Sequence, residues 1–221
     1  MMELTPELLL QAYASGVFPM AESAEDDRIF WVDPDLRGII PLDTFHVPRS
    51  LRKAIRKTDI QVRCDTAFEE TVRGCAEMTD DRQDTWINST IFKLYNELHR
   101  LGFAHSVECW RYGELVGGLY GVSLRGAFFG ESMFSRATNA SKIALVHLVA
   151  RMKFSGLTLL DTQFVTDHLN QFGTIEIPRD DYHALLSEAL KIETQFFTGV
   201  SDPALDSVLS RVLTQSSTQT S

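Results

Sequence analysis

Apolar residues recur every three or four positions in several segments of the chain, which is the spacing of amphipathic helices. The first helix is expected after Thr5, where a proline and an acid suit the opening turn, and Gly16 is expected to end it. Asn88 is expected to cap another helix, which ends at Gly102. The same pattern predicts further helices over 48–57, after 65–66, over 140–154 and after Pro178.

Other apolar runs predict strands. Three strands, over 105–111, 115–122 and 127–134, follow one another through short links typical of hairpins. After the helix over 140–154 come a buried strand over 157–164 and a short one over 174–177. The order β-β-β-α-β-β-α predicts an α/β (α+β) fold with a mostly antiparallel sheet.

The pattern of apolar and polar residues suggests three parts of the chain. Short apolar pieces among acids and prolines indicate a small N-terminal α/β unit at 1–45, followed by a larger domain at 46–213. The residues at 214–221 are rich in Ser, Thr and Gln, and we expect them to be disordered. A polar run at 78–84 is expected to be a loop that leads to Trp86.

Composition narrows the class of protein. The net charge of -9 argues against a general nucleic-acid coat protein, although it leaves room for a local basic patch. Three cysteines without paired spacing argue against a disulfide framework or a zinc site, and they suggest a reducing compartment. Neither a secretory leader nor a membrane-spanning run is recognisable, so we expect a cytoplasmic protein.

The run from Leu115 to Leu145 combines several glycines with apolar residues and one acid, Glu131. Glycines add no volume to a core but let backbones turn or a ligand approach closely. A carboxylate among phenylalanines and methionine should have a raised pKa or hold a cation, unless it lies on the solvated face of its strand. The run therefore suggests a site.

Asp161 and Gln163 are two residues apart at the end of an apolar strand, so their side chains are expected on the same face. A buried acid needs a partner, and the amide of Gln163 offers one. An acid that caps the following loop explains the pair equally well.

One basic cluster stands out in this acidic protein. Its members lie along one stripe of the helix expected at 48–57, with the apolar residues of that helix free to face inward. Such a stripe suits contact with phosphates, although an ordinary solvated face has the same pattern. The cluster consists of Arg49, Arg52, Lys53, Arg56 and Lys57.

Three further site types are disfavoured. The histidines show no paired ligand spacing, so we expect no metal site. The Gly-rich run lacks the Gly-Lys-Ser/Thr ending of a nucleotide-binding loop. Ser132 lacks the second glycine of a hydrolase nucleophile elbow, so it is not expected to be a nucleophile.

A series of short motifs closely resembles the leucyl/phenylalanyl-tRNA–protein transferases of bacteria, from Leu4 to about Leu190. The central block is highly specific, whereas each motif alone would be weak. In chain order, the motifs are Tyr13-x-x-Gly16-x-Phe18-Pro19, Trp31-x-x-Pro34-x-x-Arg37, Arg49-Ser50-Leu51, Thr85-Trp86-Ile87, His105-Ser106-Val107-Glu108, the run Leu115 to Val122, Gly130-Glu131-Ser132-Met133-Phe134 and Asp161-Thr162-Gln163.

The resemblance implies an enzyme that transfers leucine or phenylalanine, with methionine as a further candidate, from aminoacyl-tRNA to the α-amino group of proteins beginning with Arg or Lys. The product would be marked for degradation by the N-degron pathway. The resemblance also implies a C-terminal domain of the acetyltransferase (GNAT-like) superfold and no cofactor. We expect a monomer without a membrane partner.

Residue roles follow from the same resemblance. Asp161 and Gln163 match the family's proposed catalytic pair, in which the acid polarises the glutamine to help deprotonate the amine. Glu131 would attract the acceptor's basic residue or hold its amine. Trp86, Leu119, Phe128 and Ser132 match positions that bind the amino-acid side chain and the terminal adenosine, and Met20 stands where the family often has Trp. Arg49, Lys53, Arg56 and Lys57 match the cluster that contacts tRNA.

Besides Met20, two further departures qualify the resemblance. An N-terminal strand segment present in longer members is absent ahead of Thr5. Gln171-Phe172-Gly173-Thr174 replaces the usual Ser-Leu-Gly-Ala, which would alter the donor preference if Phe172 or Thr174 reached the amino-acid pocket.

Two other functions remain open. One is a GNAT-fold acyltransferase that uses acyl-CoA, although residues 136–140 lack the glycine-rich pyrophosphate loop of that class. The other is a non-catalytic tRNA-binding module, which would need the basic stripe but neither Asp161 nor Glu131.

Overall fold

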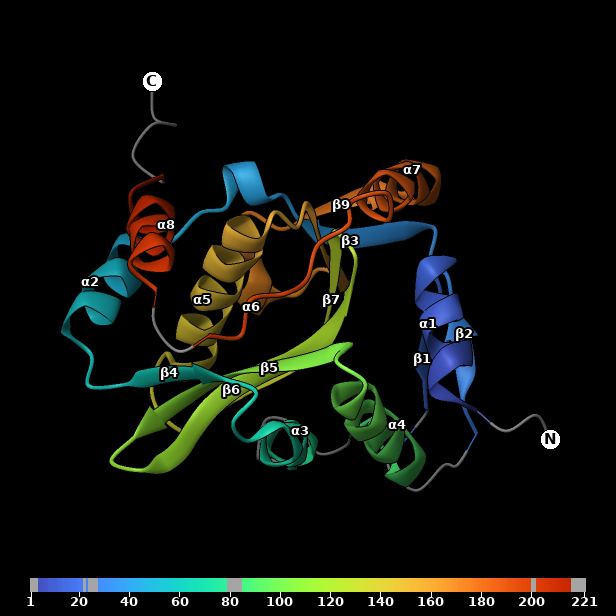
Figure 1. Cartoon of the computed structure of the whole chain (residues 1–221), viewed down its shortest axis with the longest axis horizontal. Helices are drawn as coiled ribbons and strands as arrows, with labels where there is room; N and C mark the ends of the chain where they lie inside the picture. The colour runs from blue at the N-terminus through green and yellow to red at the C-terminus, as the bar shows by residue number, and fades with distance from the viewer. Residues whose placement is uncertain (1–3, 22, 24–27, 79–84, 200–201, 216–221) are drawn as a thin grey trace.

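A computed structural model describes residues 4–21, 23, 28–78, 85–199 and 202–215. Its centre is a seven-stranded sheet in the order β4-β5-β6-β7-β8-β3-β9 (Figure 1). Neighbouring strands are antiparallel except for β7 and β8, which are parallel, so the expected mixed α/β fold with a mostly antiparallel sheet is confirmed. The strands are β3 (Leu36–Ile40), β4 (Gln61–Cys64), β5 (Ala104–Arg111), β6 (Glu114–Leu124), β7 (Ala127–Ser135), β8 (Leu159–Gln163) and β9 (Ile175–Pro178).

Helices cover both faces of this sheet. Figure 1 shows α5 and α8 on one face and α3 and α4 on the other. Adjacent strand residues therefore enter different cores: Phe128 packs with the α5 side, and Phe129 packs with the α3 and α4 side. The helices are α1 (Pro6–Ala14), α2 (Arg49–Lys57), α3 (Phe68–Ala76), α4 (Ser89–Arg100), α5 (Ala140–Ser155), α6 (Asp167–Asn170), α7 (Arg179–Ala189), α8 (Pro203–Thr214) and the 3-10 turn η1 (Leu42–Thr44).

The sequence signals at the helix ends explain where several helices begin and stop. The Thr5 side chain accepts a hydrogen bond from the backbone of α1, and Asn88 does the same for α4. Gly102 and Gly156 have φ of +81° and +79°, the left-handed conformation in which glycine ends a helix without strain. Local capping chemistry thus fixes these boundaries.

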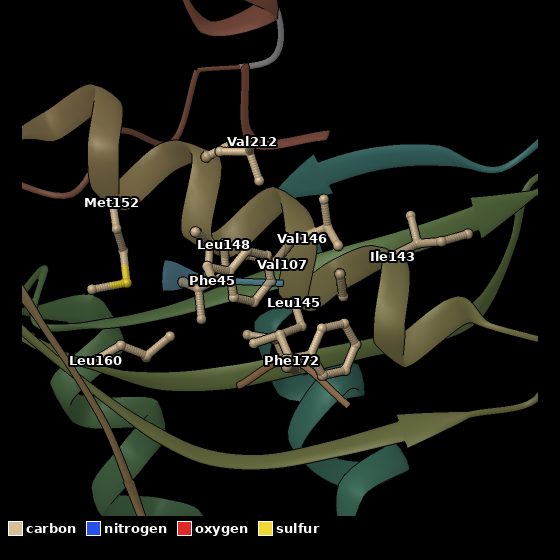
Figure 2. Packing of buried hydrophobic residues seen from close by; sticks show 14 of the residues in the cluster. Phe45, Val107, Ile143, Leu145, Val146, Leu148, Met152, Leu160, Phe172 and Val212 are labelled. Atoms are coloured by element: carbon tan, nitrogen blue, oxygen red, sulfur yellow. The ribbon is translucent and has the colours of Figure 1, made fainter. Parts of the chain in front are cut away.

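α5 is the central helix of one core. Its buried residues include Ile143, Leu145, Val146, Leu148 and Met152, which Figure 2 shows packed among side chains of the sheet and the C-terminal helix. A helix that is apolar on most sides must be covered on most sides, and α2, α8 and the strands supply that cover.

The N-terminal residues do not form a unit that ends at residue 45. α1 packs beside a small two-stranded sheet of β1 (Phe18–Met20) and β2 (Phe30–Val32), but β3 lies in the large sheet between β8 and β9. The expected boundary at residue 45 therefore falls after a strand of the main sheet. A short apolar run predicts a strand but not its partners, because those partners are more than a hundred residues away in sequence.

Two details of the C-terminal part differ from expectation. α8 was not expected, because only the helix after Pro178 stood out in that part of the sequence. Leu185 of α7 is 45% exposed, although the apolar residues of an amphipathic helix are expected to face inward. Residues 79–84 of the loop expected at 78–84 and residues 216–221 of the tail expected at 214–221 lie outside the described residues, whereas Thr214 is the last residue of α8 and not disordered. Within the described chain, no helix is long and apolar enough to cross a membrane.

Candidate active site

A β-bulge in β7 determines the position of Glu131. In the pairing of β6 with β7, Tyr120 lies opposite Ser132 and Gly121 lies opposite Gly130, so Glu131 is the extra residue. On its other side, β7 pairs with β8 only as far as Phe129. Beyond this point the two strands no longer pair, and a cavity of about 320 Å³ opens there.

The cavity brings together segments that are far apart in the sequence. Six of the expected site residues line it: Met20, Trp86, Leu119, Glu131, Ser132 and Gln163. Most of the remaining wall is apolar and comes from β1, β7, α5, β8 and α6, with Phe18, Pro19, Met133, Leu145, Leu148, Leu160, Phe164 and Leu169. The other lining residues are Tyr120, Gly130, Thr162, Thr166 and His168.

Two tyrosines hold the carboxylate of Glu131. The hydroxyl of Tyr13 donates to Oε1 at 2.6 Å, and the hydroxyl of Tyr95 donates to Oε2 at 2.8 Å. The two hydroxyls also lie 2.5 Å apart. Burial raises the pKa of Glu131 to about 7, although the tyrosine hydrogen bonds act in the opposite direction. Glu131 can therefore gain and lose a proton near neutral pH.

Asp161 lies behind the cavity wall and is fully buried. Its Oδ1 accepts hydrogen bonds from Arg37 Nε at 3.0 Å and from the backbone N–H of Gln163 at 2.8 Å. Its Oδ2 accepts from Arg37 Nη2 and from the Tyr182 hydroxyl, both at 2.7 Å. Every strong acceptor position is thus occupied by the protein, and the side-chain amide of Gln163 is not among the donors.

Arg37 connects this acid to the N-terminal segment. Its guanidinium lies between the rings of Phe18 and Tyr182, 4.5 Å and 4.3 Å from their centroids. Its Nη1 donates to the carbonyl of Gly16 at 2.8 Å, at the turn that leads into β1. The cation is 1% exposed, so this paired geometry fixes the cavity wall relative to the end of β8.

Gln163 ends β8 in an unusual conformation. Its φ is 59°, which is uncommon for a residue other than glycine, and its backbone bond to Asp161 holds that turn. The side chain lines the cavity, and its Nε2 is buried without a hydrogen-bond partner among the described residues. An unpaired buried donor at a cavity wall is suited to a ligand acceptor.

One expectation about the pocket, that Phe128 lines it, is wrong. Phe128 does not line the cavity; it is fully buried in the α5 core and packs on Phe196, with ring centroids 5.2 Å apart. Strand alternation turns it away from the face that carries Glu131. Phe172 and Thr174 do not line the cavity either: Phe172 stacks on Phe45, and the Thr174 hydroxyl donates to the carbonyl of Leu169 at 2.8 Å.

The basic cluster lies on α2, at the opposite end of the molecule from β1 and β2 (Figure 1). Arg49, Lys53, Arg56 and Lys57 are exposed, while Leu51 anchors the helix in the core. Arg52 turns inward, and its Nη1 donates to the carbonyl of Leu213 at 3.4 Å. α2 carries no acid of its own, so this face is strongly cationic.

Sequence reasoning missed the residues that support the two acids. Tyr13, Arg37, Tyr95 and Tyr182 were not expected at the site, although Tyr13 and Arg37 belong to the quoted motifs. Their chemistry could have indicated them in the sequence, because a buried acid needs hydrogen-bond donors and tyrosine or arginine supplies them. Their distance in sequence from Glu131 and Asp161 hid which donor belongs to which acid.

The start of α5 does not offer an acyl-CoA pyrophosphate site. The backbone N–H of Ala140 donates to the carbonyl of Ala137 at 3.0 Å, and that of Ser141 donates to the hydroxyl of Ser135 at 3.3 Å. A phosphate bound at a helix start needs such N–H groups unoccupied. This geometry disfavours the acyl-CoA alternative.

Comparisons with known proteins agree with the motifs. A family model described as leucyl/phenylalanyl-tRNA protein transferase matches residues 39–187, and the model of that family's N-terminal domain matches residues 2–35. The chain is 60% identical over 197 residues to a leucyl/phenylalanyl-tRNA–protein transferase of Paramagnetospirillum magneticum, covering 89% of this chain and 94% of that protein.

Two further relatives with the same name come from Hyphomonas neptunium and Phenylobacterium zucineum. The first is 59% identical over 201 residues, covering 91% of this chain and 78% of that protein. The second is 56% identical over 207 residues, covering 93% and 94%. Among solved structures, L-PGS from Bacillus licheniformis matches with a TM-score of 0.41 at 12% identity, covering 94% of this chain and 70% of that chain.

Proposed function

The chain belongs to the family of leucyl/phenylalanyl-tRNA protein transferases, and we propose that it transfers leucine or phenylalanine from aminoacyl-tRNA to the α-amino group of acceptor proteins that begin with Arg or Lys. The observation that carries the proposal is one cavity whose wall combines a proton-exchanging carboxylate, Glu131, with an unpaired amide, Gln163. The modified protein would then be marked for degradation.

The apolar part of the cavity suits the donor's side chain. Leu119, Met133, Leu145, Leu148 and Leu160 give a wall without charge, in which a leucyl or phenylalanyl side chain is desolvated favourably. Trp86 and Met20 lie in the same wall and would contact the terminal adenosine. The same wall is compatible with a methionyl side chain.

The chemistry is attack of an amine on an ester. The acceptor nitrogen forms a bond to the ester carbonyl carbon, the bond from that carbon to the ribose oxygen breaks, and the proton lost by the amine ends on the departing ribose hydroxyl. The carboxylate of Glu131 holds the amine and takes its proton, for which a pKa near 7 is well matched. Because the ester is already activated, orientation of the two reactants supplies much of the rate.

Gln163 and Asp161 act differently in this scheme. The Nε2 group of Gln163 donates a hydrogen bond to the ester oxygen as negative charge develops on it. Asp161 bonds to the backbone of Gln163 and to Arg37, so it is a positioning residue that fixes where the amide points. This assignment replaces direct polarisation of the glutamine amide by the acid.

The acceptor protein and the tRNA would each bind at groups of the opposite charge. Glu131 supplies the negative charge that favours an acceptor with a basic first residue. The exposed cations of α2 would contact the tRNA backbone, with Arg49, Lys53, Arg56 and Lys57 as the contact residues.

A transfer assay with matched donors tests the proposal. Purified protein with leucyl-, phenylalanyl- or methionyl-tRNA should label a peptide that begins with Arg or Lys, and it should not label a matched peptide that begins with Glu. Absence of labelling with every donor, on a peptide that another transferase of the family accepts, would refute the function. Tight calorimetric binding of acetyl-CoA would instead favour the acyl-CoA alternative.

A further inference from the structure

His168 supplies a second unsatisfied polar atom to the cavity. Its ring lines the same wall as Leu145 and Leu169, and its Nε2 is buried without a hydrogen-bond partner among the described residues. A buried polar atom without a partner costs free energy, so its presence in a substrate cavity indicates that a ligand completes it. Neither the expected site residues nor the family motifs quoted above include this histidine.

The surrounding contacts hold His168 in place. Lys142 Nζ donates to Gln171 Oε1 at 3.1 Å, and Gln171 Nε2 donates to the His168 carbonyl at 2.7 Å. Next to this chain of bonds, Phe172 stacks on Phe45 with centroids 5.6 Å apart. Gln171 thus holds the backbone of His168, and Phe172 lies beside its ring, with centroids 6.5 Å apart; both residues depart from the family pattern.

The surroundings of the His168 ring favour a ligand group without charge. Burial and then the charge of Lys142 lower the pKa of His168, so the imidazole is neutral near pH 7 and its two nitrogens are one donor and one acceptor. The positive charge of Lys142 also disfavours an ammonium group beside the ring. A hydroxyl meets both conditions, because it is uncharged and can donate or accept.

An aminoacyl-tRNA donor presents few polar groups to such a cavity. The developing charge on the ester oxygen is served by Gln163, and amines are served by Glu131, as argued above. The remaining neutral group next to the ester is the ribose hydroxyl that does not carry the amino acid. We infer that Nε2 of His168 forms a hydrogen bond with the 2′-hydroxyl of the donor's terminal ribose.

This inference rests on the proposed function and adds a recognition role to it. A 2′-hydroxyl distinguishes RNA from DNA at a given site, because it is both donor and acceptor. His168 would therefore make the enzyme sensitive to the chemical identity of the terminal sugar, independently of the apolar wall that reads the amino-acid side chain.

Binding of a non-reactive donor analogue tests the inference without transfer. The probes are 3′-leucylamido-3′-deoxyadenosine and its counterpart without the 2′-hydroxyl, measured by calorimetry with the wild type, His168→Leu and His168→Gln. Loss of one hydrogen bond weakens binding about fivefold. The wild type should lose about that factor on removal of the hydroxyl, and His168→Leu should bind both probes equally and weakly.

Two further variants exclude a general structural effect. His168→Gln retains a polar group and should recover part of the preference for the hydroxyl, whereas Asn170→Ala, on the exposed side of the same short helix, should behave as the wild type. Thermal unfolding of each variant shows whether it is folded. If His168→Leu does not fold, the preference of His168→Gln relative to the wild type decides the matter.

The experiment distinguishes failure of this inference from failure of the proposed function. Suppose that the wild type transfers leucine, and that His168→Leu loses as much affinity as the wild type when the probe lacks the 2′-hydroxyl. The inference is then wrong and the proposed function stands. Equal binding of both probes by the wild type would overturn the inference in the same way. If the wild type neither transfers leucine nor binds either probe, the proposed function fails and the inference fails with it.

Discussion

Two carboxylates near the same cavity have opposite surroundings. Asp161 is fully buried against a guanidinium, a tyrosine hydroxyl and a backbone N–H, and it does not line the cavity. Glu131 lines the cavity and has two tyrosine hydroxyls but no hydrogen bond from a cation among the described residues. Asp161 is held by these donors, and it fixes the structure around it.

The difference shows how the neighbours of an acid decide its role. A guanidinium with two parallel hydrogen bonds holds a carboxylate in one position. Tyrosine hydroxyls satisfy a carboxylate without cancelling the cost of burying its charge, so its pKa stays high. The pair thus separates positioning from proton exchange. Three of the predictions below change one side of this comparison, and the prediction for α2 changes neither.

The largest effect is expected from removing the cation on the Asp161 side. Arg37→Met should lower the free energy of unfolding by about 3–5 kcal/mol, because it leaves a buried carboxylate without its ion-pair partner. Denaturant unfolding at neutral pH measures this change. In the double variant Arg37→Met/Asp161→Leu much of the loss should be recovered, since no buried charge remains; an equal or larger loss would contradict the role given to the pair.

On the Glu131 side, Glu131→Gln should slow transfer about a hundredfold through the loss of a proton acceptor. Leucine transfer to an Arg-initiated peptide at saturating tRNA measures it. The same variant should be more stable to unfolding than the wild type at pH 8, by about 3 kcal/mol, because a raised pKa means that ionising Glu131 destabilises the fold. Protonated Glu131 stabilises the wild type, and this contribution is lost as the pH rises from about 4.5 towards 7. The wild type and Glu131→Gln should therefore have similar free energies of unfolding near pH 4. If Glu131→Gln transfers leucine as fast as the wild type, Glu131 is not the proton acceptor of the reaction.

Reversing charges on α2 should affect the donor and leave the two acids untouched. The triple variant Arg49→Glu/Lys53→Glu/Arg56→Glu should weaken tRNA binding about tenfold and flatten its salt dependence. Filter binding at several salt concentrations measures both. A matched triple reversal of exposed cations elsewhere in the chain, Arg73, Arg100 and Lys191, tests whether net charge alone is responsible. If it weakens binding equally, the α2 stripe has no special role.

The smallest effect is expected from trimming one donor of Glu131. Tyr95→Phe removes a hydrogen bond that lowers the pKa of Glu131, so the pKa should rise by less than one unit, at a cost of about 1 kcal/mol. The pH at which transfer reaches half its maximum should rise with it. A fall in that pH, with the fold intact, would show that the hydroxyl acts otherwise than as a donor to the carboxylate.

Local signals made much of this fold predictable. Thr5, Asn88, Gly102 and Gly156 act at helix ends through their own neighbours, so the sequence alone indicates them. The hairpin link at Tyr112-Gly113 is equally local, with φ of 53° and 83°. The insertion of β3 between β8 and β9 depends on partners far away in the chain, so a local pattern does not reveal it.

The same distinction applies to the site. Glu131 and Gln163 stand out because their chemistry conflicts with apolar neighbours in the sequence, and both line the cavity. Phe128 looked like a wall residue, yet the alternation of the strand directs it into the α5 core. The donors Tyr13 and Arg37 lie more than a hundred residues from the acids they bind, and only the folded chain shows which acid each one serves.

Titration of the glutamate side chains by carbon-13 NMR tests the central distinction most directly. One glutamate carboxyl is expected to titrate at about pH 7 in the wild type; its signal should be absent in Glu131→Gln, and its pKa should be higher in Tyr95→Phe. If every glutamate carboxyl titrates near the ordinary value of 4.5, or if the signal near pH 7 persists in Glu131→Gln, Glu131 is not the proton-exchanging group of this cavity.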